Sequence, residues 1–140
     1  KVGLASIRLG YLIGKKEVVS AIDKARLPFN ITFPTQVIGR IVLTEGRQEL
    51  KNQITTVKQE RERVMNEISK ISAVKVYPSD ANFFLMKTPD ANKTHQELIK
   101  RGVLTRNMSH LPKMENCIRV SIGKKEENDE FIKAMKDIFT

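Results

Sequence analysis

Residues 47–71 read RQELKNQITTVKQERERVMNEISKI, and this stretch sets the organisation of the chain. Its apolar residues recur every three or four positions, which predicts one face of a long amphipathic helix. The members of that face are Leu50, Ile54, Val57, Val64, Ile68 and Ile71, with Arg61 as an interruption. The opposite face is expected in solvent and carries Lys51, Glu60, Glu62 and Glu67. A coiled coil needs more heptads than are present, so we expect a helix that links two domains.

Downstream of this helix, the pattern changes to short strands and helices in alternation. Strands are predicted at 74–77, 81–87, 103–106 and 118–122, and helices at 93–100 and 125–139. Gly102 follows the first of these helices, at the position where glycine commonly ends a helix. The order β-β-α-β-β-α predicts a compact α/β unit over residues 73–140.

Upstream of the long helix, the chain is predicted to be mostly helical. Residues 9–13 are apolar and stop at Gly14, which predicts a short buried strand. Helices are expected over 15–25 and 35–43. Prolines at 28 and 34 predict an extended loop or turn between them, over residues 26–34. We therefore divide the chain into residues 1–46, a linking helix at 47–72 and the α/β unit at 73–140.

The composition is that of a globular domain. With 140 residues, 40% of them hydrophobic, the chain is long enough for its own core. No stretch approaches the ~20 apolar residues of a membrane-spanning helix, and no signal-peptide pattern is present. The single cysteine, Cys117, cannot form an internal disulfide, is expected to be buried, and fits a cytoplasmic protein. The sequence opens without an initiator methionine, as if cut from a longer protein.

The formal net charge of +9 favours anionic ligands or nucleic acid. However, the basic residues are interleaved with acidic ones, as in residues 58–63 and 124–127, which is typical of solvated helix surface. The chain has no tryptophan, and no predicted strand carries the paired exposed rings of a base-stacking platform. Nucleic acid is therefore not the expected partner, although a free-standing module that binds anions or nucleic acid remains the alternative from another functional class.

Two arginines are candidates for anion binding. Side chains alternate across a strand, so Ile118, Val120 and Ile122 share one face and Arg119 lies on the other. There its guanidinium has room to hold a planar anion through two hydrogen bonds. Arg106 ends a predicted strand beside a polar loop, where binding residues often lie. The alternative for both arginines is an ordinary surface charge.

The two histidines do not indicate a metal site. His95 and His110 are far apart and lack neighbouring residues at metal-ligand spacing. We expect His95 on a helix surface and His110 in a loop. The glycines near the start of the chain do not form a phosphate-binding loop of the P-loop type. Spacing alone therefore predicts an anion-binding α/β domain.

Four segments resemble those of the fold-type I aminotransferases, enzymes that depend on pyridoxal 5′-phosphate (PLP). These segments are Lys1-Val2-Gly3-Leu4-Ala5-Ser6-Ile7-Arg8-Leu9-Gly10-Tyr11, Leu27-Pro28-Phe29-Asn30-Ile31-Thr32, Tyr77-Pro78-Ser79-Asp80-Ala81-Asn82-Phe83 and Cys117-Ile118-Arg119-Val120-Ser121-Ile122-Gly123 followed by Glu126-Glu127-Asn128. Their order and spacing cover essentially the whole chain. Within that family the pattern most resembles the histidinol-phosphate aminotransferases of histidine biosynthesis.

The resemblance implies a role for each candidate residue. Lys1 would attach to PLP and shuttle the substrate proton, and Arg8 would hold the cofactor phosphate. Arg119 would bind a substrate carboxylate, and Arg106 would bind a substrate phosphate. Asn30 and Phe29 would reach toward the site of a neighbouring subunit in a homodimer. The implied substrates are a phosphorylated amino alcohol and the pair glutamate/2-oxoglutarate, with no metal.

The resemblance also implies the domain structure. Residues 1–46 would be the remnant of a large PLP-binding domain, and residues 73–140 the small C-terminal α+β domain. The remaining cofactor-binding residues of the family precede the lysine, so we expect the 140 residues alone to be inactive. Related aminotransferases for aromatic amino acids and PLP-dependent decarboxylases of phosphoamino acids are the alternatives within the enzyme class.

Overall fold

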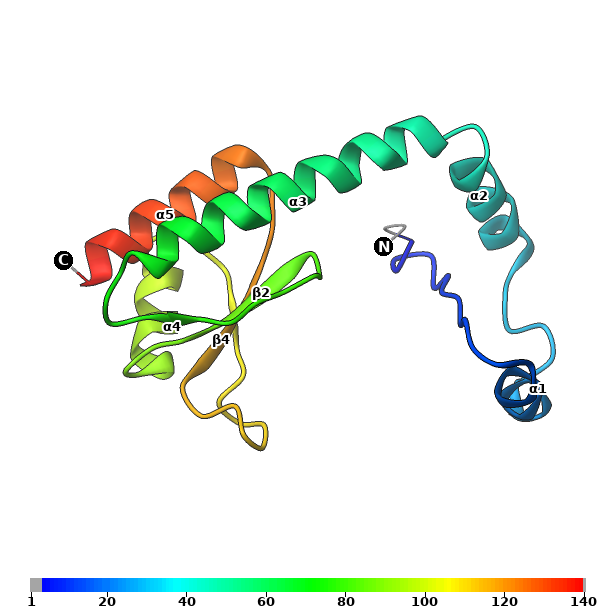
Figure 1. Cartoon of the computed structure of the whole chain (residues 1–140), viewed down its shortest axis with the longest axis horizontal. Helices are drawn as coiled ribbons and strands as arrows, with labels where there is room; N and C mark the ends of the chain where they lie inside the picture. Colours follow the sequence, from blue (N-terminus) through cyan, green and yellow to red (C-terminus); the bar gives the residue numbers. More distant parts are fainter. Residues whose placement is uncertain (1–3, 140) are drawn as a thin grey trace. The chain divides into compact units, whose positions relative to one another are not determined.

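The computed structural model describes residues 4–139, and these form two compact units with a boundary between Gln53 and Ile54. The first unit contains α1 (Lys16–Ala25), α2 (Phe33–Leu43) and the beginning of α3 (Arg47–Ser69). The second contains the rest of α3, then β1 (Lys75–Val76), β2 (Phe83–Lys87), α4 (Ala91–Lys100), β3 (Arg106–Asn107), β4 (Cys117–Ser121) and α5 (Lys125–Phe139) (Figure 1). The predicted mixture of helices and sheet is confirmed. Among the described helices, none combines the length and the apolarity needed to cross a membrane.

The second unit is built on a four-stranded antiparallel sheet in the order β1-β2-β4-β3. β4 lies in the interior of the sheet and pairs with β2 along its whole length. On its other side β4 pairs with the two-residue edge strand β3. The sheet therefore places β3 and β2 on either side of the strand that carries Arg119.

The core lies on one face of this sheet. Ile118 and Val120 of β4 and Phe84 and Met86 of β2 are buried there, as the alternation of side chains requires. Helices α3, α4 and α5 all contribute to the same core, through Val64, Ile68, Leu98, Phe131 and Met135 among others. The rings of Phe84 and Phe131 meet edge to face at 6.4 Å. The three helices thus cover one face and, within the described residues of this unit, leave the face that carries Arg119 open.

The third predicted strand was placed too early. It was expected over 103–106, but β3 is Arg106–Asn107. The backbone N–H of Val103 donates to the carbonyl of Leu98 at 2.9 Å, within the turn that ends α4. The N–H of Val103 is therefore used in the turn at the end of α4, and pairing with β4 begins only at Arg106.

The long helix is confirmed, but two of its charged residues are not where the pattern predicts. Arg61, expected as an interruption, is buried, and its Nη1 donates to the carbonyl oxygen of Ala81 at 3.1 Å. Glu60, expected in solvent, has a side chain only 13% exposed and accepts from Asn128 of α5 at 2.8 Å. Both residues face neighbouring segments because α3 is covered on more than its apolar stripe.

In the first unit, α1 and α2 are confirmed and the predicted strand is wrong. α2 begins at Phe33 rather than Thr35, because Thr32 accepts the N–H of Thr35 and proline is tolerated in the first turn. Residues 9–13 form no strand, and Tyr11 is 74% exposed. A strand requires a hydrogen-bonding neighbour, and every strand of the described chain belongs to the second unit.

Candidate functional site

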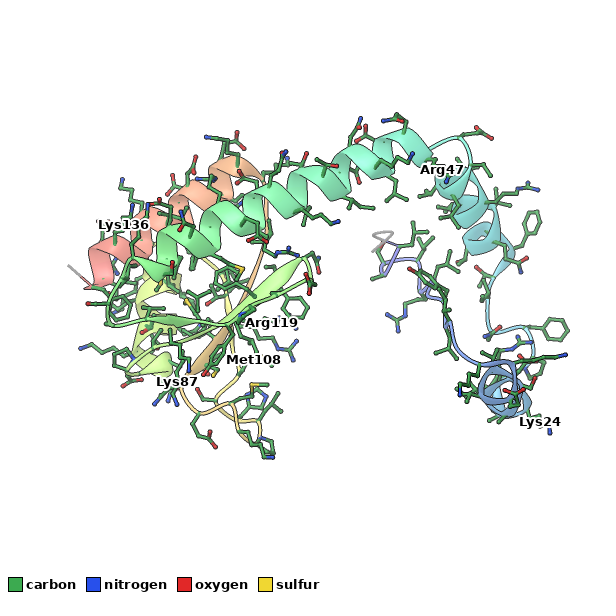
Figure 2. All side chains as sticks on the ribbon, in the orientation of Figure 1. Lys24, Arg47, Lys87, Met108, Arg119 and Lys136 are labelled. Atoms are coloured by element: carbon green, nitrogen blue, oxygen red, sulfur yellow. The ribbon has the colours of Figure 1, made fainter. Side chains whose placement is uncertain are left out.

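Arg106 and Arg119 lie directly opposite each other on the paired strands β3 and β4. Cross-strand partners in an antiparallel pair project from the same face of the sheet. The two guanidinium groups therefore belong to one face, the one that α3, α4 and α5 leave uncovered. Arg106 is exposed and Arg119 is half-buried; Figure 2 labels Arg119 on β4.

The surroundings of Arg119 come from β2. Leu85 is its cross-strand partner on that side, and the centre of the Phe83 ring lies 5.3 Å from the guanidinium carbon. Such a ring attracts a cation through its electron-rich face and keeps the guanidinium plane in a defined orientation. The Nε atom of Arg119 is buried and has no hydrogen-bond partner within the described part of the chain. A buried donor left unbonded is costly, so this nitrogen lowers the stability of the fold.

Neither arginine has an acidic partner among residues 4–139. All the ion pairs found in this part of the chain involve other basic residues, which lie on or directly after α1, α3, α4 and α5. Two like charges at directly opposed positions of a sheet destabilise it. A bound anion would remove that repulsion, so this pair has the chemistry of a site for carboxylate or phosphate.

The acidic residues with shifted pKa values lie on α3, α4 and α5, away from the two arginines, and form ion pairs on and between these helices. Hydrogen bonds from Arg63 keep the pKa of Glu60 below its usual value. Hydrogen bonds from Lys100 and Arg101 lower the pKa of Glu97 to about 2. These carboxylates stay ionised and neutralise nearby cations, so they are not candidates for proton transfer at neutral pH.

The histidines match the prediction in part. His110 is exposed in the loop after β3, as expected. His95 is half-buried rather than on the open surface, and its Nδ1 lies 3.0 Å from Thr105 Oγ1. No cluster of three potential metal ligands occurs among the residues described.

In the first unit, Arg8 follows the start of the described chain and is exposed. It lies in a left-handed backbone conformation with φ of 60°, in a turn closed by a hydrogen bond of 3.1 Å from its N–H to the carbonyl of Ala5. Its side chain is exposed and forms no ion pair with any described residue. Lys1, the predicted attachment point of the cofactor, lies outside the described residues.

The remaining pair of predicted site residues lies in the loop after α1. Phe29 is 98% exposed and also has a left-handed backbone, with φ of 55°. The side-chain oxygen of Asn30 accepts a hydrogen bond from Arg26 Nη1 at 2.9 Å. Arg26 in turn pairs with Asp23 of α1 at 2.6 Å, so Asn30 is tied to the end of that helix.

Some residues around the arginines were not identified from sequence. The alternation within Phe83–Lys87 places Phe83 and Leu85 on one face, but the register that brings them beside Arg119 is not visible in either strand alone. The contact of His95 with the segment before Arg106 was also missed, because the spacing of ten residues across a helix end has no sequence signature.

The chain is similar in sequence to known aminotransferases. It is 51% identical over 138 residues to the histidinol-phosphate aminotransferase of Aquifex aeolicus, a match that covers 98% of this chain and 39% of that protein. It is 49% identical over 138 residues to the enzyme of the same name from Hydrogenobaculum sp., covering 99% of this chain and 40% of that protein. The chain therefore spans about two fifths of the length of these relatives.

Solved structures show the same fold. A decarboxylase from Sulfurospirillum multivorans matches 99% of this chain and 41% of its own with a TM-score of 0.83 and 26% identity. The histidinol-phosphate aminotransferase from Clostridium acetobutylicum matches 97% of this chain and 42% of its own, also with a TM-score of 0.83, at 23% identity. The family model described as aminotransferase class I and II matches residues 1–135. Because this match spans almost the whole chain, the chain belongs to the class I and II aminotransferase family.

Proposed function

We propose that this chain forms the C-terminal part of a PLP-dependent aminotransferase that exchanges an amino group between glutamate/2-oxoglutarate and histidinol phosphate/imidazole acetol phosphate. The observation that carries the proposal is the opposed pair Arg106 and Arg119, on the sheet face that α3, α4 and α5 leave open. Neither arginine forms an ion pair in the described chain. The names of the two relatives at 51% and 49% identity support histidinol phosphate as a substrate.

The substrates of such a reaction require two cationic groups. Arg119 would bind a carboxylate of glutamate through two parallel hydrogen bonds, with Phe83 holding the guanidinium in place. Arg106 would bind the phosphate of the phosphorylated amino alcohol. Because one pocket must accept both a dicarboxylate and a phosphate ester, two adjacent arginines suit it better than one.

Arg8 fits the phosphate of PLP. Its exposed guanidinium is unpaired within the described chain, and the backbone turn beneath it is closed by hydrogen bonds. When bound, PLP would supply a carbonyl carbon that takes the amino group and a ring that accepts electrons from the substrate. Lys1 is proposed to hold the cofactor through Nζ and to take the proton from the substrate carbon once that amine is released.

The whole enzyme is proposed to be a homodimer. Phe29 is almost completely exposed at a position where the chain itself offers nothing to cover it within residues 4–53. Aromatic residues are enriched at the interfaces between protein subunits. We therefore assign Phe29 and Asn30 to contact with the neighbouring subunit.

The test uses a chimera in which this chain replaces the matching region of the Aquifex aeolicus relative. The chimera is expected to transfer the amino group of glutamate to imidazole acetol phosphate. Lys1→Ala should abolish both this transfer and the visible absorbance of lysine-bound PLP, while Lys16→Ala, on the exposed start of α1, should change neither. A folded chimera that binds PLP and transfers no amino group would contradict the proposal.

Decarboxylation of a phosphorylated amino acid is the second candidate. The similarity to the Sulfurospirillum multivorans decarboxylase, at 26% identity and a TM-score of 0.83, supports decarboxylation as the reaction, and its name gives no substrate. The same arginine pair suits a phosphoamino acid, since one group would bind phosphate and the other carboxylate. Release of CO₂ from a phosphoamino acid by the chimera, with no transfer to 2-oxoglutarate, would select this reaction instead.

A further inference from the structure

Arg106 belongs to a strand that few backbone hydrogen bonds keep in position. β3 has two residues, lies at the edge of the sheet, and pairs on one side only, with β4. A two-residue edge strand gains few backbone hydrogen bonds, so its position depends on what its side chains contact. By contrast, Arg119 lies on a strand paired on both sides and needs no such support.

Helix α4 contacts the residue on each side of Arg106. Thr105 Oγ1 lies 3.0 Å from His95 Nδ1, and Asn107 Nδ2 donates to Asn92 Oδ1 at 2.6 Å. Side chains alternate along the extended segment, so the two neighbours turn toward α4 and Arg106 turns to the opposite face. The two contacts thus anchor the residues before and after Arg106 to α4, on the face of the sheet opposite to the arginine side chain.

The amide of Asn107 is oriented by a second hydrogen bond. Its Oδ1 accepts the backbone N–H of Ser109 at 2.9 Å. With the oxygen so occupied, the amide nitrogen is the atom that must face Asn92, as a donor to that oxygen. The loop after β3 and helix α4 therefore hold Asn107 between them.

Helix α4 is a firm base for these contacts. Asp90 caps its first turn by accepting the N–H of Lys93 at 2.9 Å, and the N–H of Ala91 donates to Asn116 Oδ1 at 3.3 Å. Ala91 and Leu98 are completely buried in the core. Because α4 is fixed in this way, Thr105 and Asn107, which contact it, are also held in position.

We propose that Asn92 and His95, acting through Asn107 and Thr105, are positioning residues that hold Arg106 opposite Arg119 for binding of a phosphorylated substrate. This inference rests on the proposed function of Arg106. When the contacts are lost, the edge strand shifts and the Arg106 guanidinium no longer lies where it can bind the substrate phosphate. Arg119, on the interior strand, keeps its place.

The test compares variants in the active chimera. Thr105→Val removes the hydroxyl at nearly constant shape, Asn92→Ala removes the acceptor, and Thr105→Ser keeps the hydroxyl. The Thr105→Val/Asn92→Ala variant is expected to raise the KM for the phosphorylated substrate about tenfold with little change in kcat, as for a misplaced binding group. Thr105→Ser should behave as wild type, and so should Gln96→Ala, at an exposed position of α4.

A double-mutant comparison separates positioning from general stability. In an Arg106→Gln background, the Thr105→Val/Asn92→Ala pair should raise the KM no further, because the group it positions is gone. An equal rise in both backgrounds would overturn the inference. If Asn92→Ala prevents folding, as judged by thermal melting, the isosteric Thr105→Val carries the test alone.

The failures of the two proposals can be told apart. If Arg106→Gln raises the KM for the phosphorylated substrate and the Thr105→Val/Asn92→Ala variant does not, the positioning role is wrong and the function of Arg106 stands. If Arg106→Gln leaves that KM unchanged, both the phosphate-binding role of Arg106 and the positioning role are wrong.

A measurement that does not need turnover is the NMR titration of the 140-residue chain with inorganic phosphate. The dissociation constant reported by the Arg106 Nε–H signal should rise in Thr105→Val, and an unchanged constant would contradict the inference.

Discussion

Arg119 combines a fixed position with an unsatisfied donor. Its strand is paired on both sides, Phe83 lies against its guanidinium, and its buried Nε has no partner in residues 4–139. A hydrogen bond to a charged group contributes about 1.5–3 kcal/mol, and a lysine cannot reproduce the two parallel bonds of a guanidinium. We expect Arg119→Lys in the chimera to raise the KM for glutamate by about 10- to 100-fold. Steady-state kinetics with glutamate check this, and a KM within twofold of wild type would contradict it.

Arg119 is also expected to lower the free energy of unfolding of the chain. Arg119 opposes Arg106 with a like charge and leaves a buried donor unbonded, and both features are destabilising. Replacing it with methionine keeps much of the volume and loses the contact of the cation with the Phe83 ring, which is worth about 0.5–1 kcal/mol. Arg119→Met in the 140-residue chain is therefore expected to raise the free energy of unfolding by about 1 kcal/mol.

Urea denaturation measures this change. The matched control is Arg101→Met, which removes an exposed arginine paired with Glu97 and should shift stability by less than about 0.5 kcal/mol. A loss of stability in Arg119→Met would show that the guanidinium is a structural group rather than one kept for a ligand.

At the scale of residues, the sequence predicts which side chains face away from the core but not which of them meet. The alternation Ile118-Arg119-Val120 correctly placed Arg119 opposite the core, and both isoleucine and valine are buried. The meeting of Arg106 with Arg119 depends on the register between β3 and β4. That register is set by contacts with α4 and with the following loop, which no local pattern encodes.

At the scale of elements, α3 and α5 are joined by a charged network. Glu60 of α3 accepts from Arg63 and from Asn128 of α5, and Arg63 also pairs with Asp129 of α5 at 2.7 Å. These bonds hold the pKa of Glu60 below its usual value, with the hydrogen bond from Arg63 as the main cause. The folded state therefore binds the Glu60 proton less tightly than the unfolded state does.

Because folding lowers the pKa of Glu60, the stability of the fold depends on pH in a defined direction. A carboxyl whose pKa is depressed by folding contributes stability above its unfolded pKa, and this contribution is lost as pH falls through the folded pKa. Glu60→Gln is expected to lower the free energy of unfolding by about 1 kcal/mol at pH 7. It should also weaken the dependence of stability on pH below the usual glutamate range. Urea denaturation from pH 7 down to pH 3 tests this, with Glu130→Gln at an exposed position of α5 as the control. Parallel pH profiles for Glu60→Gln and the unmodified chain would contradict the account.

The helices were predicted better than the strands for a physical reason. Helical spacing repeats within one segment, so α1, α2, α3, α4 and α5 are all legible from their own residues. A strand exists only with a partner, so the apolar stretch at 9–13 predicted a strand that the described chain does not form. Arg61 was read as an interruption of α3 because its acceptor, the carbonyl of Ala81, is twenty residues away.

At the scale of the whole molecule, the chain matches about two fifths of its relatives. We propose that the rest of the cofactor site lies in the portion of the relatives that it does not match. The 140-residue polypeptide alone, supplied with PLP, glutamate and imidazole acetol phosphate, is expected to transfer no amino group. Measurable glutamate-dependent transfer by the purified polypeptide, absent in its Lys1→Ala variant, would contradict this.

We propose that the opposed arginines select the substrate. The ratio of kcat/KM for histidinol phosphate to that for histidinol in the chimera tests this directly. Arg106→Gln removes a charge-assisted pair of hydrogen bonds to phosphate, so the ratio is expected to fall by about 100-fold while kcat/KM for histidinol stays within about threefold. An unchanged ratio, or an equal loss with both substrates, would show that Arg106 does not recognise the phosphate.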